Sequence, residues 1–379
     1  MNKIRSLRLV AGLICLLPIS FYATPLSAQT AAGPPSSLAP GPKPPEAPIA
    51  WKQLVGIYEY TSYNSPKQTM IFLEKNQHLF MQPKDSVEKR EPIDEKDGRV
   101  LVTDPDGRTY LYDEHRDESG NVASFSYLAE YFIRADAGSN PAKFYHVTPS
   151  KPVAELRAEA LRESPPKEAG TFRKPDLVEV VKLDPSVRLD IRYANSNNFL
   201  STPVYSQARA LLQRPAAEAL VRVQRKLQPL GYGLLIHDAY RPWYVTEIFW
   251  EATPSEGKIF VADPKKGSKH NRGCAVDLTL FDLSTGQPVE MPGLYDEMSP
   301  RSFPTFPGGT SLQRWNRELL RRAMEAEGFT VNEDEWWHFD YKDWKRYPIL
   351  NIPFENLGEL WPPSAREGTR DGPASRHEY

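Results

Sequence analysis

The chain has 379 residues, of which 40% are hydrophobic and 25% are charged. This composition is typical of globular proteins and excludes a collagen, a long coiled coil and a wholly disordered chain. The length favours two domains, and the formal net charge of −2 offers no basic surface for nucleic acid. Proline is frequent, with 36 residues, which is about twice its average usage. We therefore expect proline to mark linkers.

Residues 1–28 have the pattern of a secretory signal peptide. A basic start precedes a mainly apolar run over residues 9–22, and small residues lead to a cleavage site at Ala28. The apolar run is shorter than the roughly 20 residues of a membrane-spanning helix, which favours cleavage over an anchor. We predict an exported protein, periplasmic or secreted, with no membrane span in the mature chain. Cys274 would then be its only cysteine, so no internal disulfide is expected.

Composition divides the rest of the chain into segments. We predict a Pro-rich linker at 29–50, a small all-β domain at 51–150, a linker at 151–174, a second domain at 175–357 and a disordered tail at 358–379.

The first domain is predicted from short runs of β-branched and aromatic residues that alternate with turn sequences. This pattern favours a small antiparallel barrel or sandwich, and it weakly resembles the lipocalin-like domains of some bacterial exported hydrolases. Strands are expected at 57–61, 69–73, 78–82, 100–103, 108–111, 122–127 and 131–134. We assign this domain no chemistry, and leave its role open between substrate binding and contact with peptidoglycan.

The second domain shows helices and strands in irregular order, which favours an α+β fold over a parallel doubly wound sheet. We expect a central antiparallel sheet with flanking helices. Amphipathic helices are predicted at 215–228 and 312–327. Strands are predicted at 178–182, 189–193, 233–237, 275–281 and 337–341.

The first candidate site lies in residues 268–277. His270 belongs to a polar loop, and Asp277 lies inside the apolar strand that follows. An acid in an apolar strand is costly unless it is paired or bound to a metal. An ion pair with Arg or Lys is therefore the alternative to a metal ligand.

Two further motifs carry residues of the same kind. Glu335 and His338 flank two tryptophans, and they can reach one site only if the backbone turns between them. The alternative is a solvent-exposed Glu and a packed His. Arg241 follows a predicted strand, and an ion pair with a carboxylate is the simpler explanation of it.

Together, these motifs fit one reaction. His270, Asp277 and His338 form a ligand set that suits zinc and leaves a fourth position for water, although Co²⁺ and Fe²⁺ remain open. Glu335 could take a proton from that water. Arg241 could stabilise the negative oxygen of the tetrahedral intermediate.

Residues 178–357 resemble the zinc D-alanyl-D-alanine dipeptidases, the family of the vancomycin-resistance dipeptidase, which is related to zinc D,D-carboxypeptidases. The family's S-x-H-x-x-G-x-A-x-D motif is matched at full spacing by residues 268–277. Its E-x-W-H motif is matched by residues 335–338, and residues 240–242 agree as well.

This resemblance implies one Zn²⁺ per chain, held by the two histidines and the aspartate named above. It also implies Glu335 as general base and later proton donor, and Arg241 as the group that stabilises the transition state. Asp296 falls where the family holds the free amino group of the substrate. Ser268 lies where a group near the substrate carboxylate is expected. Tyr193 and Tyr205 would wall the pocket.

The chain also departs from the family pattern. Cys274 replaces a small residue such as Ser, and its thiol could make the site oxidisable; as a ligand it fits the motif less well than Asp277. Residues 301–303 differ from a His-rich stretch of the family, which leaves substrate selectivity open.

The expected activity is hydrolysis of D-Ala-D-Ala or a related short D-amino-acid dipeptide in cell-wall peptide turnover. A zinc D,D- or L,D-carboxypeptidase acting on peptidoglycan stem peptides is the alternative. Asp296 favours dipeptides, because a carboxylate that captures a free amino terminus selects short substrates. A zinc-stabilised binding module without catalysis is a third hypothesis.

Overall fold

The computed structural model describes residues 38–62, 65–86, 91–103, 106–136 and 146–357. The predicted signal peptide and the predicted tail lie outside the described residues. Among the described helices, none combines the length and the apolar character that a membrane span needs. The two domains below belong to one compact unit.

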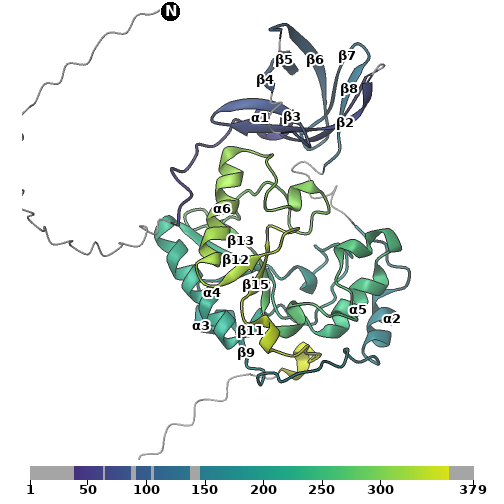
Figure 1. The fold of residues 1–379 in the computed structure, drawn as a ribbon, viewed down its shortest axis with the longest axis vertical. Helices are drawn as coiled ribbons and strands as arrows, with labels where there is room; N and C mark the ends of the chain where they lie inside the picture. Colours follow the sequence, from purple (N-terminus) through teal and green to yellow (C-terminus); the bar gives the residue numbers. More distant parts are fainter. Residues whose placement is uncertain (1–37, 63–64, 87–90, 104–105, 137–145, 358–379) are drawn as a thin grey trace, which may run out of the picture. The chain divides into compact units, whose positions relative to one another are not determined.

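The first domain is a closed antiparallel barrel of eight strands, β1 to β8 in chain order (Figure 1). A short helix, α1 (Ile49–Leu54), precedes it. The strands are β1 (Gly56–Ser62), β2 (Ser65–Lys75), β3 (His78–Pro83), β4 (Glu91–Lys96), β5 (Arg99–Thr103), β6 (Thr109–Arg116), β7 (Val122–Tyr127) and β8 (Glu130–Arg134). The barrel prediction is thus confirmed, and β4, which was not expected, completes it.

Aromatic side chains fill the barrel interior. Phe72, Phe125 and Phe132 are buried, and the rings of Phe125 and Phe132 stack with centroids 4.4 Å apart. Side chains alternate between the two faces of each strand, so these rings form the core of a small barrel. The sequence of β4 hides its strand character, because it is mostly charged and contains Pro92.

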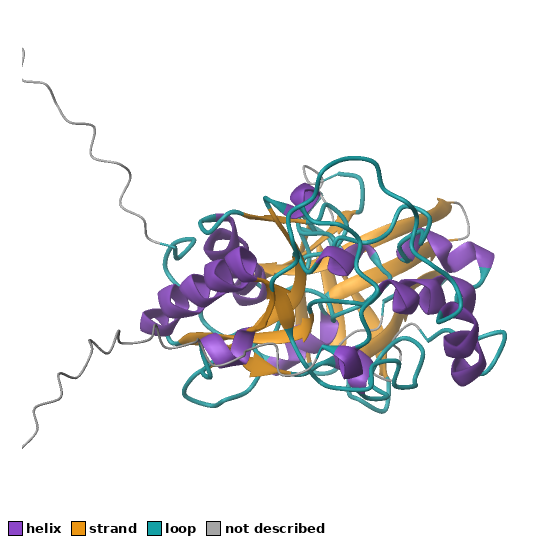
Figure 2. Ribbon diagram, turned by 90° about the horizontal axis from the view of Figure 1, so that it is seen from below, coloured by secondary structure: helices purple, strands orange, loops and turns teal. Residues whose placement is uncertain are grey.

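The second domain is α+β, with helices around a five-stranded sheet (Figure 2). The strand order is β10-β12-β13-β15-β14, and β9 and β11 form a separate pair. The strands are β9 (Leu177–Glu179), β10 (Arg188–Leu189), β11 (Leu211–Gln213), β12 (Tyr232–Asp238), β13 (Ala275–Asp282), β14 (Phe329–Val331) and β15 (His338–Tyr341). The α-helices are α2 (Val153–Ala160), α3 (Val180–Leu183), α4 (Arg214–Leu227), α5 (Trp243–Ala252) and α6 (Ser311–Glu325). Short 3₁₀ helices are η2 (Arg192–Ala194), η3 (Gln228–Leu230), η4 (Ser255–Phe260), η5 (His270–Arg272), η6 (Pro300–Ser302), η7 (Trp344–Arg346) and η8 (Phe354–Asn356).

Four details differ from the sequence predictions. The strand expected at 189–193 ends with β10 at Leu189, and residues 192–194 form the 3₁₀ helix η2 instead. The sheet is mixed rather than fully antiparallel, because β10 runs parallel to β12. The strand expected at 178–182 stops after β9, where α3 begins, since β9 pairs with β11 over only three residues. Residues 151–174, expected as a linker, contain α2, which packs against α5.

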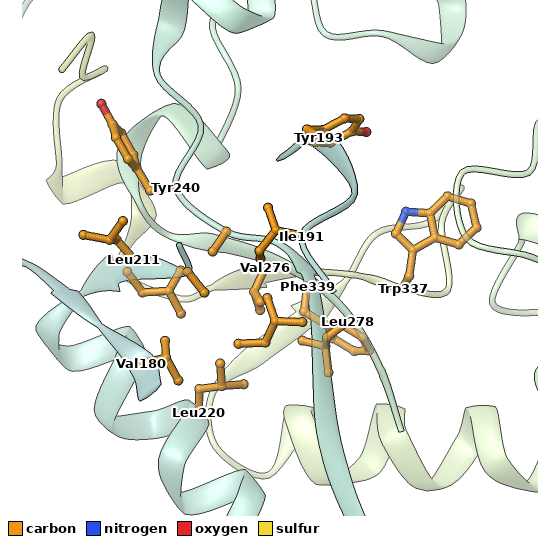
Figure 3. Close-up of a cluster of buried hydrophobic side chains, with 14 of the residues drawn as sticks. Val180, Ile191, Tyr193, Leu211, Leu220, Tyr240, Val276, Leu278, Trp337 and Phe339 are labelled. Atoms are coloured by element: carbon orange, nitrogen blue, oxygen red, sulfur yellow. The ribbon is translucent and has the colours of Figure 1, made fainter. Parts of the chain in front are cut away.

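The apolar core lies where α4 and α6 pack on the sheet. Leu220 of α4 belongs to the same buried cluster as Val276, Leu278 and Phe339 of the sheet (Figure 3). Each such aliphatic side chain contributes roughly 1.5–3 kcal/mol when it leaves water. Because neighbouring side chains of a strand point to opposite faces, Asp277 points away from the face of Val276 and Leu278. The core therefore fixes the strand that presents Asp277.

Candidate metal centre and active site

Three residues predicted as metal ligands come together in the second domain. Asp277 on β13 and His338 at the start of β15 are direct partners in the antiparallel register, and His270 lies in η5, just before β13. His270 Nε2 lies 3.3 Å and His338 Nδ1 3.1 Å from Asp277 Oδ1. The two ring nitrogens are 3.1 Å apart. One ligand atom from each residue thus fits a single ion.

The outer nitrogen of each imidazole is engaged by an oxygen. His270 Nδ1 lies 2.7 Å from the carbonyl of Ala239, and His338 Nε2 lies 3.0 Å from Asp340 Oδ1. We assign an N–H group to each outer nitrogen, because the Ala239 carbonyl and the Asp340 carboxylate can only accept hydrogen bonds. The lone pairs of the inner nitrogens then face Asp277. Outer partners of this kind orient histidines that bind metals.

Asp277 Oδ1 supports the same conclusion. With the imidazole N–H groups on the outer nitrogens, this buried oxygen receives no hydrogen bond from the described residues, although buried polar atoms are normally satisfied. The other oxygen, Oδ2, accepts a hydrogen bond of 3.2 Å from the Tyr295 hydroxyl. Three convergent lone pairs repel one another unless a cation lies between them. The residues therefore fit a divalent metal with nitrogen and oxygen ligands.

The carboxylates create a field that attracts positive charge. Burial alone would lower the pKa of His338, but without a metal ion the nearby carboxylates of Asp277 and Asp340 raise it to about 10. The pKa of Asp277 is lowered by the two histidines although burial acts in the opposite direction. A cation at this site, whether a proton or a metal ion, is thus strongly favoured.

Cys274 takes no part in the cluster. Its thiol is free and buried, and it is absent from the ligand group found among the described residues. Burial raises the pKa of the thiol to about 12. Because the thiolate is the reactive form, this cysteine is poorly disposed to oxidation.

A cavity of about 710 Å³ opens beside the three candidate metal ligands. Predicted site residues contribute to its wall, namely Tyr193, Arg241, Ser268, His270, Asp277, Asp296, Glu335 and His338. The structure thus gathers into one cavity residues that are far apart in the sequence. Tyr205 is not among the lining residues.

Glu335 lies close to the candidate metal ligand His338 because the chain turns before β15. Trp336 and Trp337 form the turn, as the sequence analysis required, and Glu335 Oε2 lies 3.7 Å from His338 Nδ1. Asn332 Nδ2 lies 3.3 Å from the same oxygen. Burial and the charge of Asp277 raise the pKa of Glu335. A carboxylate with a raised pKa beside a metal site is suited to accept and return a proton.

Arg241 is held at the cavity wall by Asp238. Its Nε and Nη2 donate to Asp238 Oδ2 over 3.1 and 2.8 Å, and its guanidinium lies over the Phe249 ring, 4.8 Å from the centroid. Burial alone would lower the pKa of Arg241, but Asp238 raises it well above its usual value. The ion pair foreseen as an alternative exists, and it fixes Arg241 in the cavity. The Tyr205 hydroxyl donates a hydrogen bond of 2.7 Å to Asp238 Oδ1 and so helps to hold the partner of Arg241 in place.

Asp296 is a buried carboxyl group that also lines the cavity. It accepts a hydrogen bond of 2.9 Å from the Tyr193 hydroxyl, and its backbone has a φ of 57°. This left-handed conformation is costly outside glycine, and such strain often marks a binding site. Burial, followed by the charges of Asp277 and Glu335, raises the pKa of Asp296 well above its usual value. A positively charged group of a substrate would stabilise the ionised carboxylate and so offset the free-energy cost of burying its charge.

Ser268 lies two residues before η5. Its hydroxyl oxygen accepts a hydrogen bond of 3.2 Å from the His270 backbone N–H, and its own N–H donates to Asn271 Oδ1 over 2.6 Å. Ser268 therefore shapes the loop that delivers His270, in addition to lining the cavity. Its role toward a substrate carboxylate stays a prediction.

Sequence reasoning missed Asp340, Asp238 and Tyr295. Asp340 was detectable, because a residue two positions after His338 in a strand lies on the same face. Asp238 lies within the segment already singled out for Arg241. Tyr295 carried no local signal, because its contact with Asp277 depends on the course of a long loop.

Comparison with known proteins agrees with this site. The family model described as D-ala-D-ala dipeptidase, of peptidase family M15, matches residues 173–356. A D-alanyl-D-alanine dipeptidase of Escherichia coli is 36% identical over 179 residues, which are 47% of this chain and 91% of that protein. The chain belongs to the D-Ala-D-Ala dipeptidase family. It is therefore a metallopeptidase.

Other members of the family give the same picture. The D-alanyl-D-alanine dipeptidase of Enterococcus faecalis is 36% identical over 189 residues, covering 44% of this chain and 92% of that protein. The one of Streptomyces coelicolor is 34% identical over 186 residues, with coverages of 44% and 92%. The family model begins after the barrel. The barrel is thus outside the part that resembles the family.

Proposed function

We propose that the protein is a zinc-dependent dipeptidase that hydrolyses D-Ala-D-Ala or a related short D-amino-acid dipeptide. The observation that carries the proposal is the convergence of three ligand lone pairs at a cavity that also holds Glu335, Arg241 and Asp296. These groups could supply metal binding, proton transfer, stabilisation of the negative oxygen and binding of the substrate amine, which hydrolysis of a dipeptide requires. The names of the relatives point to the same substrate.

Zinc is the metal we propose, at one ion per chain. Two imidazoles and one carboxylate with no other protein ligand among the described residues are typical of catalytic zinc sites. When bound, Zn²⁺ supplies Lewis-acid polarisation and lowers the pKa of water. The outer contacts of His270 and His338 keep their inner nitrogens free to bind it.

Glu335 is the proposed general base. Its Oε2 faces the metal ligands, where it would accept a proton from the attacking water and later give it to the departing amine. Its raised pKa favours this return of the proton.

Arg241 is proposed to hold the oxygen that becomes negative in the transition state. Asp238 engages Nε and Nη2, and the described residues offer Nη1 no hydrogen-bond partner. A preorganised cation of this kind needs no rearrangement when charge develops.

Asp296 is proposed to bind the free amino group of the substrate. A buried carboxyl with a raised pKa is stabilised in its charged form when an ammonium group approaches. Tyr193 orients this carboxyl. Asp296 and the metal ligands line the same cavity, so the free amino group and the cleaved peptide bond must be close together. This contact therefore selects dipeptides over longer chains.

We also propose that the enzyme works outside the cytoplasm, in the periplasm or after secretion. The support is the signal-peptide pattern of residues 1–28. Products of peptidoglycan turnover would then be its source of substrate.

A peptide panel tests the proposal. Zinc-loaded protein is incubated with D-Ala-D-Ala, N-acetyl-D-Ala-D-Ala, L-Ala-L-Ala and a stem pentapeptide that ends in D-Ala-D-Ala, and released alanine is measured. We expect cleavage of D-Ala-D-Ala and little or none of the acetylated dipeptide and the pentapeptide. Equal or faster cleavage of the pentapeptide would instead show a carboxypeptidase. Zinc binding without cleavage of any peptide would indicate a binding module.

A further inference from the structure

The carboxyl of Asp296 belongs to a loop, residues 294–303, that is held by its own hydrogen bonds. We call it the Asp296 loop. Glu297 accepts hydrogen bonds from the Leu294 N–H and the Ser299 hydroxyl, both of 2.7 Å. The Ser302 hydroxyl donates to the Glu297 carbonyl. The loop is thus folded back on Glu297, the neighbour of Asp296.

Arg301 closes the base of this loop. Its Nε donates to the Pro292 carbonyl over 2.8 Å and lies 3.5 Å from Glu297 Oε1. Gly293 runs so close to Arg301 that a Cβ at this glycine would lie 2.7 Å from the Arg301 carbonyl oxygen. Arg301 therefore ties the two ends of the loop together, and it lies in the segment that departs from the family pattern.

The guanidinium of Arg301 reaches the barrel. Its Nη1 lies 3.5 Å from Oδ1 of Asp136, and the Asp136 side chain is fully buried. Asp136 is held in place by Arg134 Nη1 at 2.9 Å and by the Ile57 N–H at 2.6 Å. Burial would raise the pKa of Asp136, but Arg301 and Arg134 hold it below its usual value. Asp136 is thus a fixed negative charge at the end of the barrel.

The chain directly after the loop also docks on the barrel. Phe306 packs in a small apolar cluster with Ile57, Ile71 and Leu73. The Gly309 carbonyl accepts a hydrogen bond of 3.1 Å from the backbone N–H of Glu74. The barrel therefore contacts the Asp296 loop at its base and the chain that leaves it.

We propose that the barrel positions the amine-binding side of the active site, with Asp136 acting through Arg301 on the Asp296 loop. Asp136 and Arg301 are positioning residues, since neither is proposed to touch the substrate. The assignment rests on the proposed function in so far as Asp296 binds the substrate amine. It gives the barrel, which lies outside the residues that the family model matches, a role in substrate affinity.

A second contact between the domains provides a matched control. Glu74 of β2 accepts a hydrogen bond of 2.6 Å from the Ser311 N–H at the start of α6, and it is also buried. Glu74→Gln removes a charge from the interface, as Asp136→Asn does. The contact of Glu74, however, ends on α6 and not on the Asp296 loop.

The test compares Asp136→Asn, Arg301→Met and Glu74→Gln in the full zinc-loaded protein. We expect the first two variants to raise KM for D-Ala-D-Ala about tenfold, a loss of about 1.4 kcal/mol, with a much smaller change in kcat. The double variant should lose no more than either single variant, because both remove one interaction. Glu74→Gln should keep the KM of the wild type.

Amide hydrogen exchange of residues 294–303 gives a second readout that needs no activity. Exchange should become faster in Asp136→Asn and Arg301→Met and stay unchanged in Glu74→Gln. Arg301→Met leaves the Arg134–Asp136 pair intact, so it keeps the test decisive if Asp136→Asn unfolds the barrel. Unchanged KM and unchanged exchange in Arg301→Met would overturn the proposal. If the wild type does not cleave D-Ala-D-Ala, the proposed function fails, and exchange alone decides the positioning role.

Discussion

Removal of the metal should destabilise the second domain by an amount that can be estimated from the site. The three ligands are almost fully buried, with exposed fractions of 2% for His270, 3% for Asp277 and 8% for His338. Without an ion, the unpartnered Oδ1 of Asp277 costs about 1–3 kcal/mol. Zinc at 1,000 times its Kd stabilises the native state by about 4 kcal/mol. For a domain of this size, a gain of 1 kcal/mol in the free energy of unfolding raises Tm by about 2–4 °C. Saturation with zinc should therefore raise Tm by about 8–16 °C.

Differential scanning calorimetry of chelator-treated protein with and without added zinc measures this effect. The transition that unfolds the second domain should move to higher temperature when zinc is added, because all three ligands belong to this domain. Asp277→Asn is the control, since an amide keeps the shape but not the charge, and its zinc-dependent shift should disappear. A wild-type Tm that saturating zinc leaves unchanged would refute the assignment of these residues as ligands.

Three further changes test the proposed roles. Arg241→Met should lower kcat for D-Ala-D-Ala about 10²–10³-fold while the zinc-dependent rise in Tm persists; an unchanged kcat would remove Arg241 from the mechanism. Asp296→Asn should raise KM for D-Ala-D-Ala about tenfold or more, because a charged hydrogen bond to the substrate amine is worth about 1.5–3 kcal/mol, and a normal KM in steady-state assays would contradict its role. Leu278→Ala should lower the free energy of unfolding by about 2–5 kcal/mol, measured by urea denaturation; a change below this range would show that the sheet does not depend on this contact.

The candidate metal site could be predicted from the sequence because the pattern that indicates it is local. The spacing within 268–277 and 335–338 matches a family motif, and Asp277 stands out as an acid in an apolar strand. The prediction that the chain turns between Glu335 and His338 followed from strand geometry and is confirmed.

Contacts that depend on tertiary structure could not be predicted from the sequence. The parallel pairing of β10 with β12 cannot be read from two residues of strand. Strand β4 carries charges and Pro92, so neither its composition nor its alternation marked it. The pair formed by Asp136 and Arg301 joins two domains, and no pattern near either residue indicates the other.

Release of D-alanine from D-Ala-D-Ala, by zinc-loaded wild-type protein and by its Glu335→Gln variant, decides whether this cavity is the site of dipeptide hydrolysis. We expect the wild type to release D-alanine. The variant should bind zinc with the same rise in Tm but release D-alanine about 10²–10⁴-fold more slowly. A zinc-loaded wild type that releases no D-alanine, or a variant that keeps the wild-type rate, would contradict this expectation.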